Sequence, residues 1–169
     1  MKILITGGCG FVGSNLAIFL KKRLKNTFIL SVDNLIRKGS LLNEKRLKKL
    51  KIYNKRIDVS NYNKIKTLKK FDLIIDCCAE PAIEASKKEP DKVFNTNLIG
   101  TFNILKKCIK DNSNIIFLSS SRVYSISKLK TLVKKLNLKK PLNLKKTVDE
   151  HFETESVSSL YGFTKLSSE

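Results

Sequence analysis

The chain has 169 residues, and its 41% hydrophobic content fits one globular domain with a buried core. Lys and Arg number 34 against 15 Asp and Glu, which gives a net charge of +19. A charge of this sign and size favours an anionic partner such as nucleic acid. Nearly all of it, however, is lysine without the interleaved aromatic residues of RNA-binding motifs. We therefore expect solvated helix faces and no nucleic-acid partner.

Membrane, secreted and metal-binding classes are also disfavoured. No apolar run approaches the roughly 18 residues of a membrane span, and glycines interrupt the first apolar stretch too early for a signal peptide. We expect a cytoplasmic protein with no membrane partner. The four cysteines form no C-x-x-C pair and His151 is the single histidine, so we expect free buried thiols, no disulfide framework and no metal site.

Strand and helix signals alternate along the chain, which predicts an α/β fold with a doubly wound parallel sheet of the Rossmann type. Right-handed crossovers predict the strand order 3-2-1-4-5 and a ligand crevice at the carboxyl ends of strands one and four. The predicted strands lie near residues 2–6, 28–32, 52–57, 72–77 and 114–119. The predicted helices lie near residues 12–24, 41–50, 61–70, 91–110 and 158–169.

The first predicted strand leads into the glycine-rich sequence TGGCGFVG and then directly into a helix. Strand, glycine turn and helix in this order are typical of a dinucleotide-binding site. Gly7 is expected to form the tight turn, Gly10 to let the backbone approach a phosphate, and Gly13 to let the helix pack closely on the strand. Backbone N–H groups around Phe11 and Val12, at the helix N-terminus, then favour a bound pyrophosphate.

The second predicted strand ends in Asp33, twenty residues after Gly13. A carboxylate at this strand end accepts hydrogen bonds from the adenosine ribose hydroxyls and repels a 2′-phosphate, which favours NAD over NADP. Arg37 and Lys38 follow closely in the sequence. These two cations leave NADP open as the alternative cofactor.

Residues after the third and fourth strands are expected to complete the crevice. Asp58 and Val59 follow strand three, where a carboxylate can reach an adenine amino group. Ala79 follows strand four, and its small side chain lets the cofactor pass close to the backbone. Asn97 and Thr101 lie on the next predicted helix. Because polar side chains are costly to bury unpaired, we expect both to bridge to neighbouring backbone.

Strand five ends in serines, and a hydroxyl from Ser120 or Ser121 can hold a substrate oxygen. Far downstream, Tyr161 and Lys165 are four residues apart, so they share one face of a helix. A lysine ammonium near a tyrosine hydroxyl favours the phenolate. Together with the glycine turn and Asp33, this pattern indicates proton transfer to or from a substrate hydroxyl.

These motifs resemble the extended short-chain dehydrogenase/reductase family, the NAD-dependent epimerases and dehydratases that act on nucleotide sugars. The resemblance covers essentially the whole chain and implies NAD as cofactor, a nucleotide-sugar substrate and a homodimer. It implies Ser120 as the catalytic hydroxyl, Tyr161 as the acid/base, and Lys165 as the residue that holds the nicotinamide ribose and tunes the tyrosine. The implied cofactor contacts are Gly7, Gly10, Phe11, Val12, Gly13, Asp33, Asn34, Asp58, Val59, Ala79, Asn97 and Lys165.

Within this family the chain is most similar to the CDP-paratose/CDP-tyvelose 2-epimerases. Dehydratases place an Asp-Glu pair after the catalytic threonine, and Ser121 and Arg122 stand there instead, so elimination lacks its acid and base. The chain departs from the family pattern at Asp76, often a histidine, at Glu80, frequently a glutamine, and at Ser125, usually a glycine. A nucleotide-sugar dehydratase or reductase stays open as an alternative.

The resemblance also shapes the expected domain organisation. Family members are much longer, so we expect residues 1–169 to be the NAD-binding domain, ending within the helix of Tyr161 and Lys165 and without the C-terminal substrate domain. Residues 126–148 are expected to be a solvated helical insertion. The expected activity is epimerisation through a transient ketosugar. A catalytically silent NAD-binding module is the alternative for the chain by itself.

Overall fold

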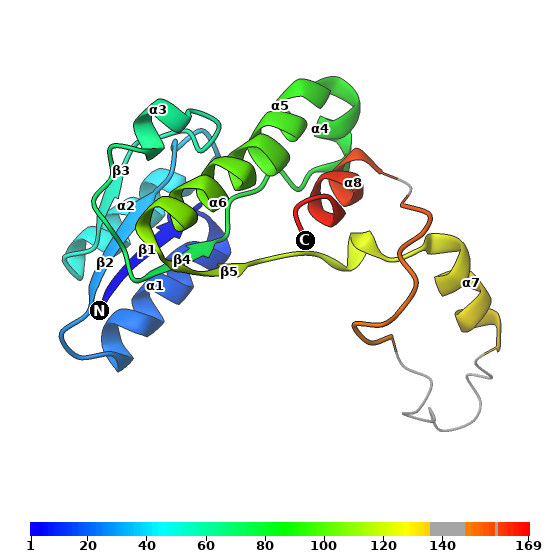
Figure 1. Cartoon of the computed structure of the whole chain (residues 1–169), viewed down its shortest axis with the longest axis horizontal. Coiled ribbons are helices and arrows are strands. Elements are labelled where there is room, and N and C mark those ends of the chain that lie inside the picture. Colours follow the sequence, from blue (N-terminus) through cyan, green and yellow to red (C-terminus); the bar gives the residue numbers. More distant parts are fainter. Residues whose placement is uncertain (136–147, 158) are drawn as a thin grey trace.

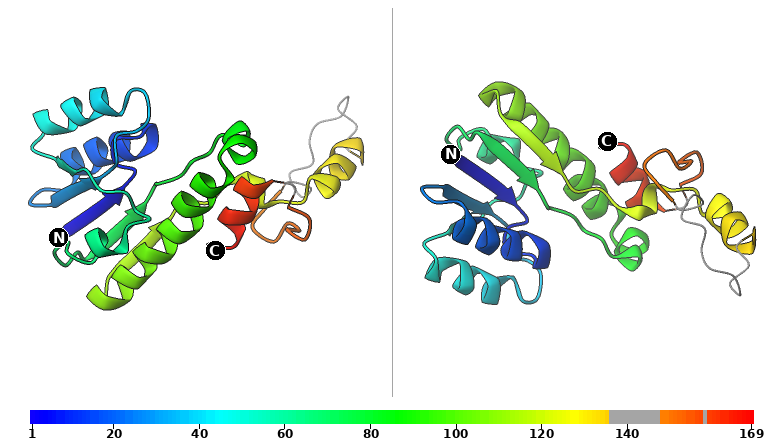
Figure 2. Two further views of the ribbon diagram at one scale, coloured as in Figure 1. Left: turned by 90° about the horizontal axis from the view of Figure 1, so that it is seen from above. Right: turned by 90° about the horizontal axis from the view of Figure 1, so that it is seen from below.

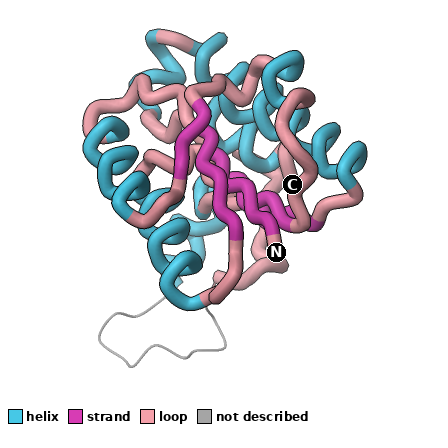
Figure 3. The backbone as a smooth tube through the Cα atoms, turned by 90° about the vertical axis from the view of Figure 1, so that its left-hand side faces the viewer, coloured by secondary structure: helices cyan, strands magenta, loops and turns pink. Residues whose placement is uncertain are grey.

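Five parallel strands form a single sheet in the order β3-β2-β1-β4-β5, and helices lie on both sides of it (Figures 1 and 3). The computed structural model describes residues 1–135, 148–157 and 159–169. The predicted fold class and strand order are therefore confirmed. The strands are β1 (Lys2–Thr6), β2 (Phe28–Val32), β3 (Tyr53–Lys55), β4 (Leu73–Asp76) and β5 (Asn114–Phe117).

The helices alternate with the strands as predicted, with one addition, α4. In the described ranges no helix is long and apolar enough to cross a membrane. The helices are α1 (Phe11–Arg23), α2 (Ser40–Lys49), α3 (Tyr62–Ile65), α4 (Ile83–Lys88), α5 (Pro90–Phe94), α6 (Gly100–Asp111), α7 (Ile126–Lys135) and α8 (Leu160–Leu166). A π-helical turn (Asn95–Ile99) joins α5 to α6, and a 3-10 turn (Ser121–Val123) follows β5.

The two-residue period of β1 divides the core into two layers, because successive side chains of a strand point to opposite faces. Leu4 packs in a cluster with Ile104 of α6, whereas Ile3 and Ile5 pack in a second cluster with Ala17 of α1. All five side chains are fully buried. Burial stabilises the fold by about 1.5–3 kcal/mol for each large aliphatic side chain. The continuous apolar run of β1 is thus explained by helices on both faces.

The strand register brings three chain segments together at one edge of the sheet. Thr6 at the end of β1 pairs with Val32 of β2 on one side and with Asp76 of β4 on the other. Since the strands are parallel, the loops that follow them all emerge at this edge. The edge is where open α/β sheets bind their ligands.

The predicted helix at residues 91–110 is a continuous rod made of α5, the π-helical turn and α6. The π-helical turn inserts one extra residue and changes which side chains face inward, a feature common at functional sites. Asn97 lies in this turn and is fully buried. Helix α8 packs beside α4 and α5 (Figure 2).

Several predicted elements are shorter than expected, and β3, α3 and α8 differ most. β3 has only three residues; it lies at the sheet edge and pairs with β2. The helix predicted at residues 61–70 ends at Ile65, and the chain continues through turns that bury Leu68 and Phe71. Helix α7 covers the first part of the predicted insertion and lies away from the sheet (Figures 1 and 2). Residues 136–147 of that insertion lie outside the described residues.

Helix α6 carries a buried ion pair between Lys107 and Asp111, and the Lys107 ammonium also donates to the Lys69 carbonyl at 3.2 Å. We expect Lys107→Met to lower the free energy of unfolding by about 3 kcal/mol, because Asp111 then stays buried without its cation. Lys110→Met, at an exposed position of the same helix, is the control and should change it by less than about 0.5 kcal/mol. Urea unfolding measures both. Equal effects would contradict a stabilising role for the pair.

Candidate dinucleotide-binding site

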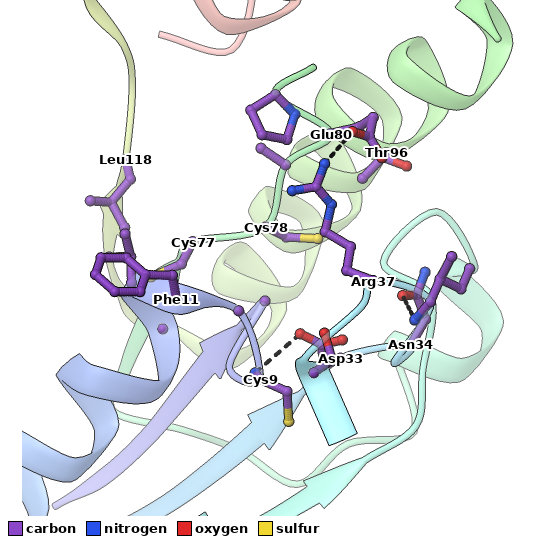
Figure 4. Close-up of a pocket in the computed structure, with 18 of the residues that line it drawn as sticks. Cys9, Phe11, Asp33, Asn34, Arg37, Cys77, Cys78, Glu80, Thr96 and Leu118 are labelled. Atoms are coloured by element: carbon purple, nitrogen blue, oxygen red, sulfur yellow. Dashed lines mark hydrogen bonds and ion pairs between the residues drawn. The ribbon is translucent and has the colours of Figure 1, made fainter. Parts of the chain in front are cut away.

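A cavity of about 510 Å³ lies at the carboxyl ends of β1, β2 and β4 (Figure 4). The glycine turn before α1 forms its floor, the loops after β2 and β4 form two walls, and α8 closes one end. The cavity is therefore at the edge of the sheet where the sequence predicts the crevice.

The glycine turn brings its five predicted cofactor contacts, Gly7, Gly10, Phe11, Val12 and Gly13, to the cavity. Gly7 has a φ of +59°, in the left-handed region that favours glycine. A Cβ atom on Gly13 would lie 2.3 Å from the Gly7 carbonyl oxygen, so only glycine lets α1 begin this close to the turn. The first N–H groups of α1 have no intrahelical acceptor. They form a cradle that fits a phosphate.

Asp33 lies at the end of β2 and faces the glycine turn (Figure 4). Its Oδ2 accepts a hydrogen bond from the Cys9 amide at 3.1 Å, and its Oδ1 accepts one from the Leu35 amide at 2.8 Å. The second lone pair of each oxygen is available to a ribose hydroxyl. Asn43 of α2 steadies the same turn, since its side-chain amide donates to the Cys9 carbonyl at 3.0 Å. Sequence reasoning missed Asn43, because only the docking of α2 brings it here.

Asn34 lines the cavity, and Asp58, which is outside the cavity lining, holds the Asn34 side chain in place. The Asn34 amide donates to Asp58 Oδ2 at 3.0 Å, while the hydroxyl and amide of Ser60 donate to Oδ1 at 2.7 and 2.9 Å. Burial acts to raise the pKa of Asp58, but the hydrogen bonds from Ser60 and Asn34 outweigh it and lower the pKa. Val59 does not line the cavity and packs in the core instead, 3% exposed.

Asn97 positions the loop after β4, in which Ala79 lines the cavity. Its side chain accepts from the Glu80 amide at 2.7 Å and donates to the Glu80 carbonyl at 3.3 Å. It also donates to the Thr164 hydroxyl of α8 at 3.2 Å. The predicted bridge from Asn97 to neighbouring backbone is confirmed. Asn97 itself is buried behind the loop and outside the cavity wall.

The corresponding prediction for Thr101 is wrong, because its hydroxyl donates to a side chain, Asp76 Oδ2, at 3.0 Å. Asp76 is 1% exposed and also accepts from the Thr6 hydroxyl and from the Cys78 amide, the latter at 3.2 Å. This carboxylate therefore joins β1, β4 and α6 immediately below the cavity. A buried carboxylate needs such donors, since an unpaired charge is costly in the interior.

Tyr161 and Lys165 line the far end of the cavity from α8. The Lys165 side chain is 2% exposed, and its ammonium donates to the Leu118 carbonyl at 2.8 Å. Burial lowers the pKa of Lys165, and the negative charge of Asp76 acts in the opposite direction. The hydrogen bond to the Leu118 carbonyl thus fixes the ammonium beside the end of β5, at the cavity wall.

The serines after β5 lie in different surroundings, because the chain enters a 3-10 turn directly after Ser120. Ser120 caps this turn, with its hydroxyl accepting from the Arg122 amide at 3.1 Å, and it does not line the cavity. Ser119 lines the cavity instead, and its hydroxyl donates to the Glu169 carboxylate. The structure therefore brings Tyr161 and Lys165 together with Ser119.

All four cysteines are free, and three of them, Cys9, Cys77 and Cys78, line the cavity. Burial raises the pKa of Cys77 to about 12 and that of Cys78 well above its usual value. These thiols therefore stay protonated at neutral pH and are poor nucleophiles. Across the described parts of the chain, no group of three His, Cys, Asp or Glu side chains is placed to hold a metal ion.

A parallel sheet with a glycine turn after its first strand and an acid after its second defines a dinucleotide-binding α/β domain. The sequence profile of the NAD dependent epimerase/dehydratase family matches residues 3–169. The chain belongs to this family. The resemblance read from the motifs is thereby confirmed.

Curated relatives include epimerases and dehydratases. The chain is 36% identical over 130 residues to a CDP-paratose 2-epimerase of Salmonella typhi, covering 73% of the chain and 38% of that protein. It is 34% identical over 130 residues to a dTDP-D-glucose 4,6-dehydratase of Dictyostelium discoideum, covering 73% of the chain and 30% of that protein. The chain thus spans less than half the length of these relatives.

Solved structures show the same fold. The UDP-Glc/GlcNAc 4-epimerase of Campylobacter jejuni is 28% identical with a TM-score of 0.75, over 99% of this chain and 46% of that one. The UDP-glucose 4-epimerase of Bifidobacterium longum, solved in complex with NAD+ and UDP, is 25% identical with a TM-score of 0.78, over 99% of this chain and 47% of that one. NAD is the cofactor of this family.

The hydrogen bonds to Asp58 predict a pH-dependent contribution to stability. Because the folded state lowers the pKa of Asp58 below its ordinary value of 3.8, the carboxylate stabilises the fold above that value, and this contribution is lost as the pH falls through the lowered pKa. We expect Asp58→Asn to reduce the free energy of unfolding more at neutral pH than in acid. Urea unfolding between about pH 7 and pH 3 measures the difference.

Asp91→Asn, at an exposed position of α5, is the matched control and should show little change in its effect across the same pH range. A deficit of Asp58→Asn that is as large in acid as at neutral pH would contradict the role assigned to the Asp58 carboxylate.

Proposed function

We propose that the chain binds NAD in this cavity, with the pyrophosphate at the start of α1 and the adenosine ribose at Asp33. The contact between the Asp33 carboxylate and the Cys9 amide carries the proposal, because it brings an acceptor for ribose hydroxyls next to free phosphate donors. The NAD complex of the Bifidobacterium longum epimerase supports it. On this proposal, Asn34 and Ala79 contact the adenosine half, and Asp58 and Asn97 position them.

We further propose that the complete activity is epimerisation of a nucleotide sugar. NAD bound in this cavity would supply the hydride chemistry at the sugar carbon, as acceptor and then as donor. Tyr161 takes the proton of the sugar hydroxyl and later gives it back. Lys165, held by the Leu118 carbonyl, stabilises the tyrosine as it loses its proton and binds the nicotinamide ribose. Ser119 or Ser120 supplies the hydroxyl that holds the substrate oxygen.

Two observations favour epimerisation over the elimination of water. The relative from Salmonella typhi is a CDP-paratose 2-epimerase, and Ser121 and Arg122 offer no acid and base for eliminating water. A dehydratase stays the second candidate because the relative from Dictyostelium discoideum is one. A catalytically silent NAD-binding module is the third, because the chain spans less than half of these relatives. We also propose that the chain forms a homodimer, as the resemblance implies. Phe102 of α6 and Phe163 of α8 support this proposal, since both side chains are about half exposed.

Isothermal titration of the 169-residue chain with NAD tests the binding proposal. We expect a saturable heat that Gly13→Ala abolishes, because the added Cβ forces α1 away from the Gly7 carbonyl and disrupts the phosphate cradle. Asp33→Asn should retain the phosphate contacts and weaken binding by about tenfold. Circular dichroism establishes that each variant is folded. The absence of heat with folded wild-type chain would refute the NAD site.

Incubation with NAD and the nucleotide sugars of the relatives, with products separated by chromatography, tests the catalytic proposal. We expect Tyr161→Phe to retain NAD affinity and to lower turnover by about 100-fold or more, the size of a lost general acid/base. Tyr53→Phe, at an exposed residue of β3, is the control and should leave turnover unchanged. Equal turnover of Tyr161→Phe and wild type would remove Tyr161 from the mechanism. No turnover by wild-type chain would instead favour the silent module.

A further inference from the structure

An ion pair spans the cavity above the proposed cofactor site. The Arg37 guanidinium, from the loop after β2, lies 2.6 Å from Glu80 Oε1 in the loop after β4. Both residues line the cavity, and Figure 4 shows the Arg37 side chain extending from its loop toward Glu80. A second cation, Lys92 of α5, lies 3.7 Å from Glu80 Oε2. The pair therefore connects the two walls between which the dinucleotide is proposed to lie.

Glu80 is the fixed partner of this pair. Its backbone amide and carbonyl are both hydrogen-bonded to the buried Asn97 side chain, at 2.7 and 3.3 Å. Its own side chain is only 10% exposed. A carboxylate this well buried requires a cation, so it draws one from whichever segment can reach it.

Arg37 is the adjustable partner. Its side chain is 51% exposed, and its short segment is bounded by Leu35 and Gly39, with φ values of 61° and 89°. Arg37 follows Asp33 by four residues, and Asp33 is the carboxylate proposed to bind the adenosine ribose. In Figure 4 the guanidinium is nevertheless directed away from Asp33 and toward Glu80. Without Glu80, the same side chain has its positive charge free within the ribose end of the cavity.

This arrangement bears on the choice between NAD and NADP, which differ by a 2′-phosphate on that ribose. Asp33 repels a 2′-phosphate, whereas a nearby arginine accommodates one, since the guanidinium fork binds phosphate through two hydrogen bonds. Both kinds of residue are present here. Whether the site rejects or accepts a 2′-phosphate therefore depends on whether Arg37 is free to bind it.

We propose that Glu80 sets the preference for NAD by holding Arg37 away from the position that a 2′-phosphate would occupy beside Asp33. This inference rests on the NAD site proposed above and deepens it. Glu80 acts through Arg37 and is a positioning residue. The preference against NADP thus has two parts, repulsion by Asp33 and sequestration of Arg37.

Calorimetric titration with NAD and with NADP tests the proposal. Glu80→Gln removes the charge and keeps the shape of the side chain, and we expect it to raise affinity for NADP by about tenfold, the size of one charge-assisted contact, with NAD affinity unchanged. The double variant Glu80→Gln with Arg37→Gln should lose that gain, and Arg37→Gln alone should bind NADP as weakly as wild type. Thermal unfolding establishes that the variants are folded.

Lys92→Gln is the matched control, since it removes the other cation near Glu80 and leaves Arg37 paired, and NADP affinity should not change. The proposal is overturned if Glu80→Gln binds NADP no better than wild type while NAD still binds. It is also overturned if the gain persists in the double variant, because the released cation would then not be Arg37. If wild-type chain binds neither dinucleotide, the NAD site itself is refuted and this inference falls with it.

Discussion

The hydrogen bond from the Cys9 amide to the Asp33 carboxylate joins the two segments on which the site depends. One segment is the glycine turn after β1, and the other is the end of β2. Because the strands are parallel and in register, both segments emerge at the same edge of the sheet. The Asp33 carboxylate therefore fixes the glycine turn, which exposes the first amides of α1. The same carboxylate still has lone pairs that can accept hydrogen bonds from a ribose. Phosphate donors and ribose acceptors are thereby held at a fixed separation, as binding an extended dinucleotide requires.

Below this edge, buried polar side chains determine how the surrounding helices sit. Asp76 accepts hydrogen bonds from β1 and α6 through Thr6 and Thr101, and Asn97 connects the loop after β4 with Thr164 of α8. Such groups are costly to bury without partners, so each network specifies one relative placement of its elements. The π-helical turn before α6 makes this placement compatible with a continuous helix, because it turns Asn97 inward. Because the hydrogen bond between Asn97 and Thr164 fixes α8, the neighbouring Lys165 lies at the cavity wall.

Different elements of the fold supply the residues proposed to bind the adenosine half of the cofactor and those proposed to transfer the proton. The elements proposed to hold the pyrophosphate and the adenosine half of NAD come from the first four strands and the segments that follow them. Tyr161 and Lys165, proposed to act at the nicotinamide ribose and the substrate, come from α8, which packs on α4 and α5. The chain spans less than half the length of its epimerase and dehydratase relatives. The proposed selection of NAD over NADP depends on residues that the structure describes, including the ion pair between Arg37 and Glu80 across the cavity.

The sequence by itself determined the sheet and the position of the site. The alternation of strand and helix signals and the right-handed crossover rule predict the order 3-2-1-4-5. The glycine turn and Asp33 are local patterns whose spacing predicts a dinucleotide site. Tyr161 and Lys165 are likewise predicted from helical spacing. Only the tertiary structure decided what these residues contact: Lys165 pairs with the Leu118 carbonyl, Thr101 with Asp76, and Arg37 with Glu80. The physical reason is separation along the chain, since Arg37 and Glu80 are 43 residues apart and Lys165 and Leu118 are 47 apart. Contacts of this kind depend on how helices dock on the sheet, which no local pattern encodes.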